Sequence, residues 1–203
     1  MRKSKSETEE TRKRIVEMAA DEFRQHGIVT SGIADLMAAA ALTHGAFYRH
    51  FESKEQLVAE ATAAALDTLL GTLSRAAGGK KGRNGLKAAL AVYVCAEHRD
   101  NPRDGCPLAA LGSELARSDK RVRDVATTGF SRMVEILVAN FDRAKPAEAR
   151  KRALATVAAM MGAVTMSRVL TDKKLSDALL QAVEEIYPEF LSRQDTTREA
   201  ESS

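Results

Sequence analysis

Residues 42–57 read LTHGAFYRHFESKEQL, and this stretch decides the fold that we expect. Phe47 and Phe51 lie four residues apart, so on a helix they share one face and can anchor it in an apolar core. Gly45 and Ala46 are small and permit close approach to the edges of DNA bases. A short helix that is anchored on one face and open on the other is what the second helix of a helix-turn-helix requires.

Polar side chains flank this anchor and suit contact with DNA. Tyr48, Arg49 and His50 can donate hydrogen bonds to phosphates. Lys54 falls in the first turn of the next predicted helix, where free amide groups and the helix dipole already favour an anion. The alternatives are a half-buried packing role for Tyr48 and an idle surface position for His44.

Two further helices are predicted before this one. Apolar periodicity indicates a first helix from about Thr8 to Gln25, and Gly27 follows as a stop signal. A second helix begins after Thr30 or Ser31, either of which can cap it. Thr43 can cap the third, short helix in the same way.

The remainder of the chain also reads as helices, and no stretch alternates as a strand does. Ser53 and Gln56 fit a capping box at the start of a long helix that ends near Gly78. The glycine- and lysine-rich residues 78–85 are expected to form a mobile loop. We therefore predict an all-α chain of about nine helices, with an N-terminal three-helix helix-turn-helix domain and a C-terminal helical domain. The predicted parts are a flexible basic arm (1–8), the helix-turn-helix domain (9–54), the helical ligand-binding and dimerisation domain (55–192) and a disordered tail (193–203).

Composition limits the class of protein. The chain has 203 residues, a net charge of +3 and 44% hydrophobic residues, which suits a folded protein with a mild basic bias. Cys95 and Cys106 are too few for a disulfide framework, and no apolar run is long enough to span a membrane. The basic start leads into acidic residues, so we expect no signal peptide and a reducing, cytoplasmic location.

Two stretches carry a resemblance to a known family. Residues 11–27 read TRKRIVEMAADEFRQHG and residues 30–57 read TSGIADLMAAAALTHGAFYRHFESKEQL. Together they resemble the DNA-binding region of the TetR family of bacterial regulators, over roughly residues 8–60. Ala41 departs from the pattern, because the family often has glycine in this turn. An alanine in a left-handed conformation would cost about 1 kcal/mol, so either the turn differs slightly or the fold absorbs this cost.

The resemblance implies a ligand-responsive transcriptional regulator, with repression as the favoured activity. It implies a homodimer that binds a near-palindromic operator in double-stranded DNA and is released by a small molecule of unknown identity. No catalytic residue, cofactor or metal is implied. By this resemblance His44, Gly45 and Ala46 face bases. The residues expected to contact DNA are Thr30, Ser31, Thr43, His44, Gly45, Ala46, Tyr48, Arg49, His50 and Lys54.

The helices after residue 55 are expected to sense a ligand and to dimerise. A mostly apolar pocket is expected to be lined by Val92, Tyr93, Cys106, Leu108, Leu111, Met133, Leu137 and Met161. A solid core made of the same residues is the alternative. A two-fold interface is expected to contain Ala158, Ala159, Gly162, Ala163, Leu179, Val183 and Ile186. Helix packing within one chain is the alternative for that set.

Cys106 precedes Pro107 and is predicted to be the N-cap of a helix. A helix N-terminus is expected to lower the pKa of a thiol, so a redox or electrophile sensor is one interpretation and an inert cap is the other. Cys95 and His98 lie close in sequence, but a metal site needs three or four ligands. The alternative functions are a helical enzyme or metal-binding protein with a chance motif, and a nonspecific architectural DNA-binding protein.

Overall fold

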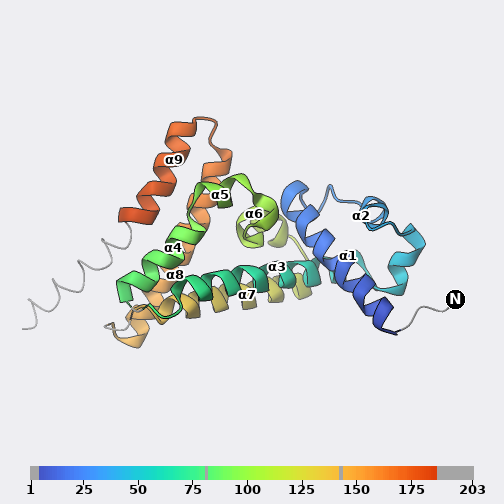
Figure 1. Ribbon diagram of the computed structural model, residues 1–203, viewed down its shortest axis with the longest axis horizontal. Helices are drawn as coiled ribbons and strands as arrows, with labels where there is room; N and C mark the ends of the chain where they lie inside the picture. The colour runs from blue at the N-terminus through green and yellow to red at the C-terminus, as the bar shows by residue number, and fades with distance from the viewer. Residues whose placement is uncertain (1–4, 81, 142–143, 187–203) are drawn as a thin grey trace, which may run out of the picture. The chain divides into compact units, whose positions relative to one another are not determined.

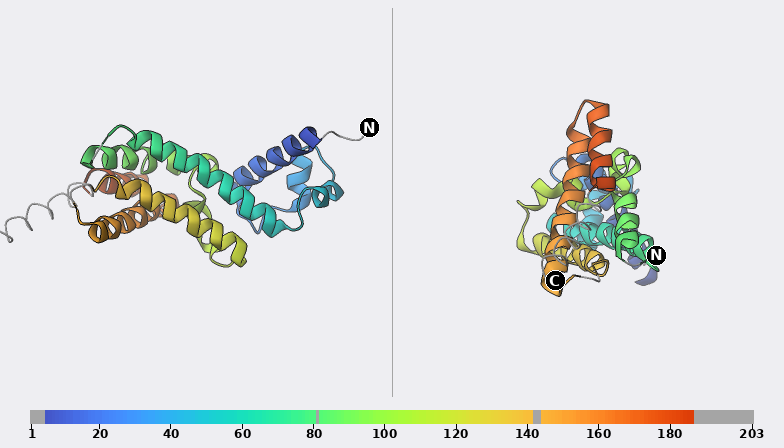
Figure 2. Two further views of the ribbon diagram at one scale, coloured as in Figure 1. Left: turned by 90° about the horizontal axis from the view of Figure 1, so that it is seen from below. Right: turned by 90° about the vertical axis from the view of Figure 1, so that its left-hand side faces the viewer.

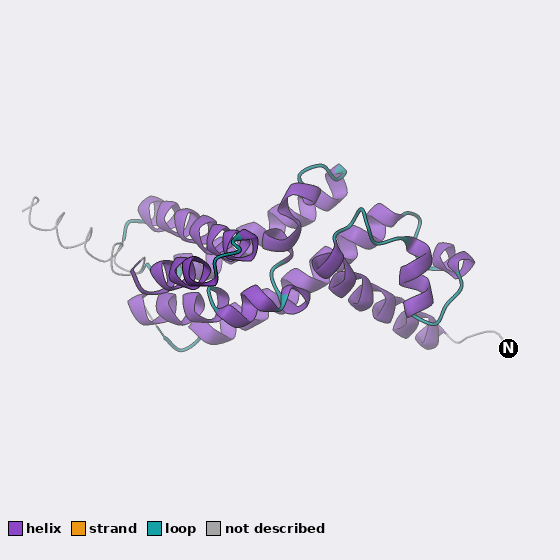
Figure 3. Ribbon diagram, turned by 90° about the horizontal axis from the view of Figure 1, so that it is seen from above, coloured by secondary structure: helices purple, strands orange, loops and turns teal. Residues whose placement is uncertain are grey.

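The computed structural model describes residues 5–80, 82–141 and 144–186, and every regular element in these ranges is helical (Figure 1 and Figure 3). In chain order the elements are α1 (Lys5–His26), α2 (Ile33–Ala39), the 3-10 helix η1 (His44–Arg49), α3 (Lys54–Ala77), α4 (Gly82–Tyr93), α5 (Ala96–Asp100), η2 (Pro102–Asp104), α6 (Pro107–Leu115), α7 (Lys120–Val138), α8 (Pro146–Val169), α9 (Lys173–Gln181) and the π-helical turn η3 (Ala182–Ile186). The all-α class is confirmed. The expected third helix is the 3-10 helix η1, and the short α5 was not predicted.

The N-terminal part of the chain is more helical than expected. α1 begins at Lys5, so the second half of the predicted flexible arm is helical. Glu7 lies in the first turn, where a carboxylate favours the helix dipole, and its carbonyl oxygen accepts a 2.7 Å bond from Thr11 Oγ1. Residues 1–4 of the arm and the predicted tail at 193–203 lie outside the described residues.

The start of α2 differs from the prediction. Gly32 is its N-cap, and no side chain bonds to the first amide groups of the helix. The hydroxyl groups of Thr30 and Ser31 instead donate back to carbonyl groups at the end of α1. These two residues therefore close α1 rather than cap α2. Thr43 is the N-cap of η1 as predicted, although its side chain makes no capping bond.

The expected loop at residues 78–85 is shorter than predicted, because α4 begins at Gly82. Gly85 lies on the buried face of this helix. A Cβ atom at Gly85 would lie 1.8 Å from Oδ1 of Asn140, just after α7. Gly85 therefore permits close helix packing, whereas the glycine- and lysine-rich composition of residues 78–85 had suggested a flexible loop.

The described residues divide into two compact units. The first contains the chain up to Thr68 together with Pro102–Gly129, and the second contains Leu69–Asn101 together with the residues from Phe130 onward. In the second unit α8 and α9 form a helical hairpin (Figure 2). The compact units do not divide at residue 54, and the predicted functional boundary there stays a prediction.

Both units have apolar cores. The largest fully buried side chains of the first unit include Ile15, Phe23, Met37, Phe47 and Leu57. Those of the second unit include Leu90, Tyr93, Met133, Leu137 and Met160. Among the described residues one helix, α3, is long and apolar enough to cross a membrane, but 56% of its apolar window is buried. Such burial is typical of a core helix.

Ala41 has a φ of 56°, so the turn is left-handed at this residue and the fold absorbs the cost. Because a left-handed alanine is strained and glycine is not, Ala41→Gly should raise the free energy of unfolding by about 1 kcal/mol. Ala38→Gly, at an exposed position inside α2, is the matched control and should lower it by up to about 1 kcal/mol. Urea unfolding measures both, and a destabilised Ala41→Gly protein would contradict the account.

Candidate nucleic-acid interface

η1 is anchored on one face, as its sequence predicts. Phe47 is 0% exposed and Phe51 is 2% exposed, with their ring centroids 5.4 Å apart. The guanidinium of Arg12 lies 4.6 Å from the centroid of the Phe51 ring and bonds both oxygens of Glu60 on α3, at 2.5 and 2.6 Å. Burial opposes ionisation of Glu60, but the bonds from Arg12 and Gln56 outweigh it and lower its pKa. These contacts join α1 to α3 and hold Phe51, which follows η1 and stacks on Phe47, against α1.

The opposite face of η1 is open. His44, Gly45 and Arg49 are exposed, as is Thr43 before them, and Tyr48 is 62% exposed. Ala46 and His50 are half-buried. The expected division between inward phenylalanines and outward polar residues is therefore present. Contact of these residues with DNA stays a prediction.

Gly45 has an environment that distinguishes it from a packing glycine. A Cβ atom built there meets no atom within 4 Å, and the residue does not have a positive φ. Neither steric packing nor backbone conformation within this unit requires glycine at this position. Gly45 lies at the exposed start of η1, the part of a recognition helix that contacts bases, so its expected role in close approach to DNA stays a prediction.

Of the other three expected DNA contacts, Thr30 and Ser31 lie in the turn between α1 and α2, and Lys54 is the first residue of α3. Ser31 is 3% exposed and its hydroxyl donates to the carbonyl oxygen of Gly27 at 2.7 Å, which leaves its side chain little surface for DNA. Thr30 is exposed. The ammonium group of Lys54 donates to the carbonyl oxygen of Ile28 at 2.6 Å, so a phosphate would have to share or replace this bond.

The residues expected to line a ligand pocket fall in both units. Cys106, Leu108 and Leu111 belong to the first, and the remaining five belong to the second. Val92 is 41% exposed and Met161 is half-buried, while the other six are buried. Burial of this kind supports the solid-core alternative within each unit.

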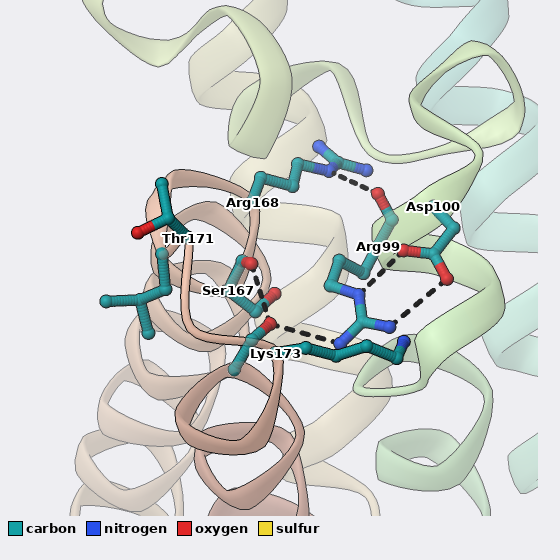
Figure 4. Close-up of a pocket in the computed structure, with 8 residues that line it drawn as sticks. Arg99, Asp100, Ser167, Arg168, Thr171 and Lys173 are labelled. Atoms are coloured by element: carbon teal, nitrogen blue, oxygen red, sulfur yellow. Dashed lines mark hydrogen bonds and ion pairs between the residues drawn. The ribbon is translucent and has the colours of Figure 1, made fainter.

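A polar pocket of about 330 Å³ lies in the second unit, and none of the expected ligand residues lines it. Its lining consists of Arg99, Asp100, Ser167, Arg168, Leu170, Thr171, Lys173 and Ser176. Figure 4 shows Arg99 bonded to Asp100, with Arg168 donating to the carbonyl oxygen of Arg99. This volume is at the low end of the range for small-molecule sites, which begins near 300 Å³.

An ion-pair network builds one wall of this pocket. Arg99 is 7% exposed, and it bonds Asp100 at 2.7 Å, Asp177 at 2.5 Å and Ser176 at 3.0 Å. The bond from Arg99, aided by the charge of Lys173, lowers the pKa of both carboxyl groups. The network joins α5 to α9, so it holds the helical hairpin in place.

His98, beside this network, gives a pH dependence. It is 8% exposed, and burial lowers its pKa below 6.5 although its Nδ1 lies 2.6 Å from the carbonyl oxygen of Tyr93. The unfolded chain takes up a proton below about pH 6.5 where folded His98 does not. Its contribution to stability is therefore present above that pH and is lost as the pH falls toward the folded pKa.

Urea midpoints at pH 7.5 and 5.5 should show this loss in the wild-type protein. The loss should be smaller in His98→Gln. His26→Gln, at an exposed position, should keep the wild-type difference. Equal differences in all three proteins would contradict the assignment to His98.

Cys106 is the N-cap of α6 with Pro107 after it, as predicted, but its thiol is 0% exposed. Cys106 therefore does not occupy the open position that a reactive thiol needs. Native Cys106 should react with iodoacetamide more slowly than Cys95, which is half-buried, and both should react alike in urea. Faster native labelling of Cys106 would favour the sensor interpretation. Among the described residues no group of three or more His, Cys, Asp or Glu is placed to hold a metal ion.

Two family models match this sequence. The model of the bacterial regulatory proteins of the tetR family matches residues 15–61, and the model of the LmrA/YxaF-like transcriptional regulator C-terminal domain matches residues 84–188, just over half of the chain. The chain belongs to the TetR family. The first match covers most of α1, all of α2 and η1 and the start of α3, which confirms the resemblance seen in the sequence.

Curated relatives are similar over a short part of the chain. The probable acrEF/envCD operon repressor of Escherichia coli K12 is 41% identical over 59 residues, 29% of this chain and 27% of the relative. The regulator TtgR of Pseudomonas putida is 40% identical over 58 residues, 29% of this chain and 28% of the relative. The match thus spans little more than a quarter of these relatives.

Two solved structures are similar to this chain over nearly its whole length. A TetR transcriptional regulator from Chloroflexus aurantiacus J-10-FL has a TM-score of 0.76 and 26% identity, covering 92% of this chain and 96% of that one. The reduced form of E. coli NemR has a TM-score of 0.73 and 17% identity, covering 87% and 95% of the two chains. The second likeness concerns the fold alone.

Proposed function

We propose that the protein is a transcriptional repressor that binds a palindromic operator as a homodimer and is released by a small molecule. The observation that carries this proposal is the open face of η1, where Gly45 is required by nothing inside the unit. Membership of the TetR family supports the same conclusion. The proposed location is the cytoplasm, where the protein has access to DNA.

An unpartnered apolar stripe on α8 supports the homodimer. Leu154 and Met166 are 40% and 47% exposed, and Ala158 and Gly162 lie between them at four-residue spacing. A Cβ atom at Gly162 meets nothing within 4 Å, so packing within the chain does not require this glycine. The buried face of α8 is mostly apolar as well, although it includes Arg152, Thr156 and Ser167. This helix therefore carries apolar residues on two faces, and the exposed one calls for a second partner.

The other residues expected at the interface behave in different ways. Ala163 is 3% exposed and packs inside its own unit, whereas Ala159, Leu179 and Val183 are half-buried. The side chain of Ile186 lies outside the described residues. Of the expected residues, Ala158 and Gly162 are exposed. We propose that these two, together with Val169 at 64% exposure, form the centre of the interface.

Two-fold symmetry would place two η1 elements on successive major grooves, so the operator should be an inverted repeat. The inducer is proposed to act on the helical part of the chain that follows residue 55. An enzyme or metal-binding protein is not favoured, since the family consists of regulators. A nonspecific architectural protein would bind all DNA alike.

Footprinting of the DNA that flanks the gene for this protein tests the proposal. We expect protection of one inverted repeat, reduced transcription from a promoter that overlaps it, and an affinity that falls steeply with salt. Sedimentation should show a dimer, and Val169→Glu should yield a monomer with weaker binding. A wild-type monomer that protects no repeat would contradict the proposal, and raised transcription would indicate an activator.

A further inference from the structure

The turn between α1 and α2 is held by side chains from two other helices. α1 ends at His26, and Gly27 follows with a φ of 91°. The ammonium group of Lys54, at the start of α3, donates to the carbonyl oxygen of Ile28 at 2.6 Å. Glu114 of α6 accepts from the amide groups of Ile28 and Val29 at 2.8 and 2.9 Å.

Glu114 occupies a pocket of backbone amide groups that depends on Gly27. Successive amide groups beside a left-handed residue form a concave site that favours an anion. Both bonds are made by Oε2 of Glu114, and a Cβ atom at Gly27 would lie 2.8 Å from Oε1. Gly27 therefore provides both the left-handed backbone and the room for the carboxylate. A charged acceptor makes these bonds stronger than those of a neutral group.

A second contact joins the same segments. Arg24 of α1 donates from Nε to the carbonyl oxygen of Arg103 in η2 at 2.5 Å and from Nη2 to Asp21 at 2.9 Å. Arg103 in turn lies 3.4 Å from the other oxygen of Asp21. The segment that contains η2 and α6 is thus bonded to α1 at two successive places, the last turns of the helix and the turn after it.

α2 follows this turn and η1 follows α2, so the position of the turn sets where both helices begin. Both helices contact each other, and α2 also contacts α1. Glu114 lies 85 and 86 residues along the chain from the amide groups that it binds, outside the helix-turn-helix. A displacement of α6 would therefore be transmitted to the start of α2 through the Glu114 carboxylate.

We propose that Glu114 is a positioning residue through which α6 holds the helix-turn-helix in its DNA-binding arrangement. This inference rests on the proposed operator binding. It adds that the affinity for DNA depends on a carboxylate that does not itself contact DNA. Glutamine keeps an acceptor oxygen at the same place without the charge, whereas alanine leaves both amide groups without this partner.

Full-length Glu114→Ala and Glu114→Gln, with Ser113→Ala as the matched exposed neighbour on α6, test the proposal. Hydrogen exchange at the amide groups of Ile28 and Val29 and affinity for the footprinted duplex are measured at a temperature where each protein is folded. In Glu114→Ala we expect at least about tenfold faster exchange at these two amide groups and at least about tenfold weaker DNA binding, because two hydrogen bonds to a charged acceptor are lost. Glu114→Gln should lie between it and the wild type, and Ser113→Ala should match the wild type.

The outcomes separate this inference from the proposed function. Wild-type binding at the repeat with unchanged affinity in Glu114→Ala overturns the inference and leaves the function intact. So does an affinity loss in which exchange rises equally across the whole protein, because that indicates general destabilisation. Absence of specific binding in the wild type overturns both. If Glu114→Ala does not fold, Glu114→Gln decides, since faster exchange confined to Ile28 and Val29 with weaker binding supports the inference and wild-type values for both overturn it.

Discussion

Replacing Gly45 with leucine is expected to reduce operator affinity to the nonspecific level while leaving the free energy of unfolding unchanged. A Cβ atom at this exposed position meets no atom of the folded unit within 4 Å, so we expect the protein to accommodate a larger side chain there. On DNA the same side chain would occupy the space between η1 and the bases. Specific affinity typically exceeds nonspecific affinity by at least about 10³-fold, and we expect a loss of that order.

Gly112→Leu is the matched control for this substitution. Gly112 is another exposed glycine, on α6 of the same unit, and a Cβ atom there also meets nothing within 4 Å. Fluorescence anisotropy with a labelled operator duplex, together with urea unfolding, compares the two variants. Equal operator affinity in the two proteins would show that η1 does not approach the bases closely.

Phe47→Ala is expected to lower the free energy of unfolding by about 3–5 kcal/mol, the usual loss when a fully buried aromatic side chain is truncated. Phe47 is 0% exposed and packs against Phe51, so its removal leaves a cavity where η1 meets the rest of the unit. Tyr48→Ala, at the next residue and 62% exposed, should change stability by no more than about 0.5 kcal/mol.

Urea unfolding of the two variants measures this contrast. Tyr48→Ala should weaken binding to operator and random DNA alike, because contacts to phosphates carry no sequence information. Phe47→Ala should lose binding through loss of structure. Similar stability losses for the two variants would mean that η1 is not oriented as described.

Much of the fold could be predicted because apolar periodicity reports burial directly. That periodicity predicted the first helix, and Ile15, Ala19 and Phe23, at four-residue spacing along it, are each at most 1% exposed. The four-residue spacing of Phe47 and Phe51 likewise separated the inward Phe47 from the outward Tyr48. Local patterns succeeded where one helix faces one core.

Glycine and hydroxyl residues were harder to interpret, because their roles depend on distant neighbours. Gly85 resembled a loop residue in sequence, yet its lack of a side chain serves the approach of Asn140. Thr30 and Ser31 are residue types that often cap the start of a helix, but their hydroxyl groups bond to carbonyl groups at and just after the end of the preceding helix. Periodicity also could not distinguish a pocket lining from a solid core, so the ligand residues remain predictions.

Glu114 gave no signal in the sequence, and the reason is physical. Its partners are backbone amide groups 85 and 86 residues away, and a backbone amide has no residue type to recognise. Near these amide groups the sequence shows Gly27, whose φ is positive in the structure, but a glycine there is already explained as a helix stop. Contacts between a side chain and a distant backbone can therefore be identified only from the structure.

Selection from a pool of random DNA duplexes with the full-length protein tests the central claim most directly. The account predicts enrichment of one inverted repeat whose half-sites are centred about one helical turn, or a multiple of it, apart. Gly45→Leu should enrich nothing from the same pool. Enrichment of no sequence by the wild-type protein, or of the same repeat by Gly45→Leu, would contradict the claim that η1 reads operator DNA.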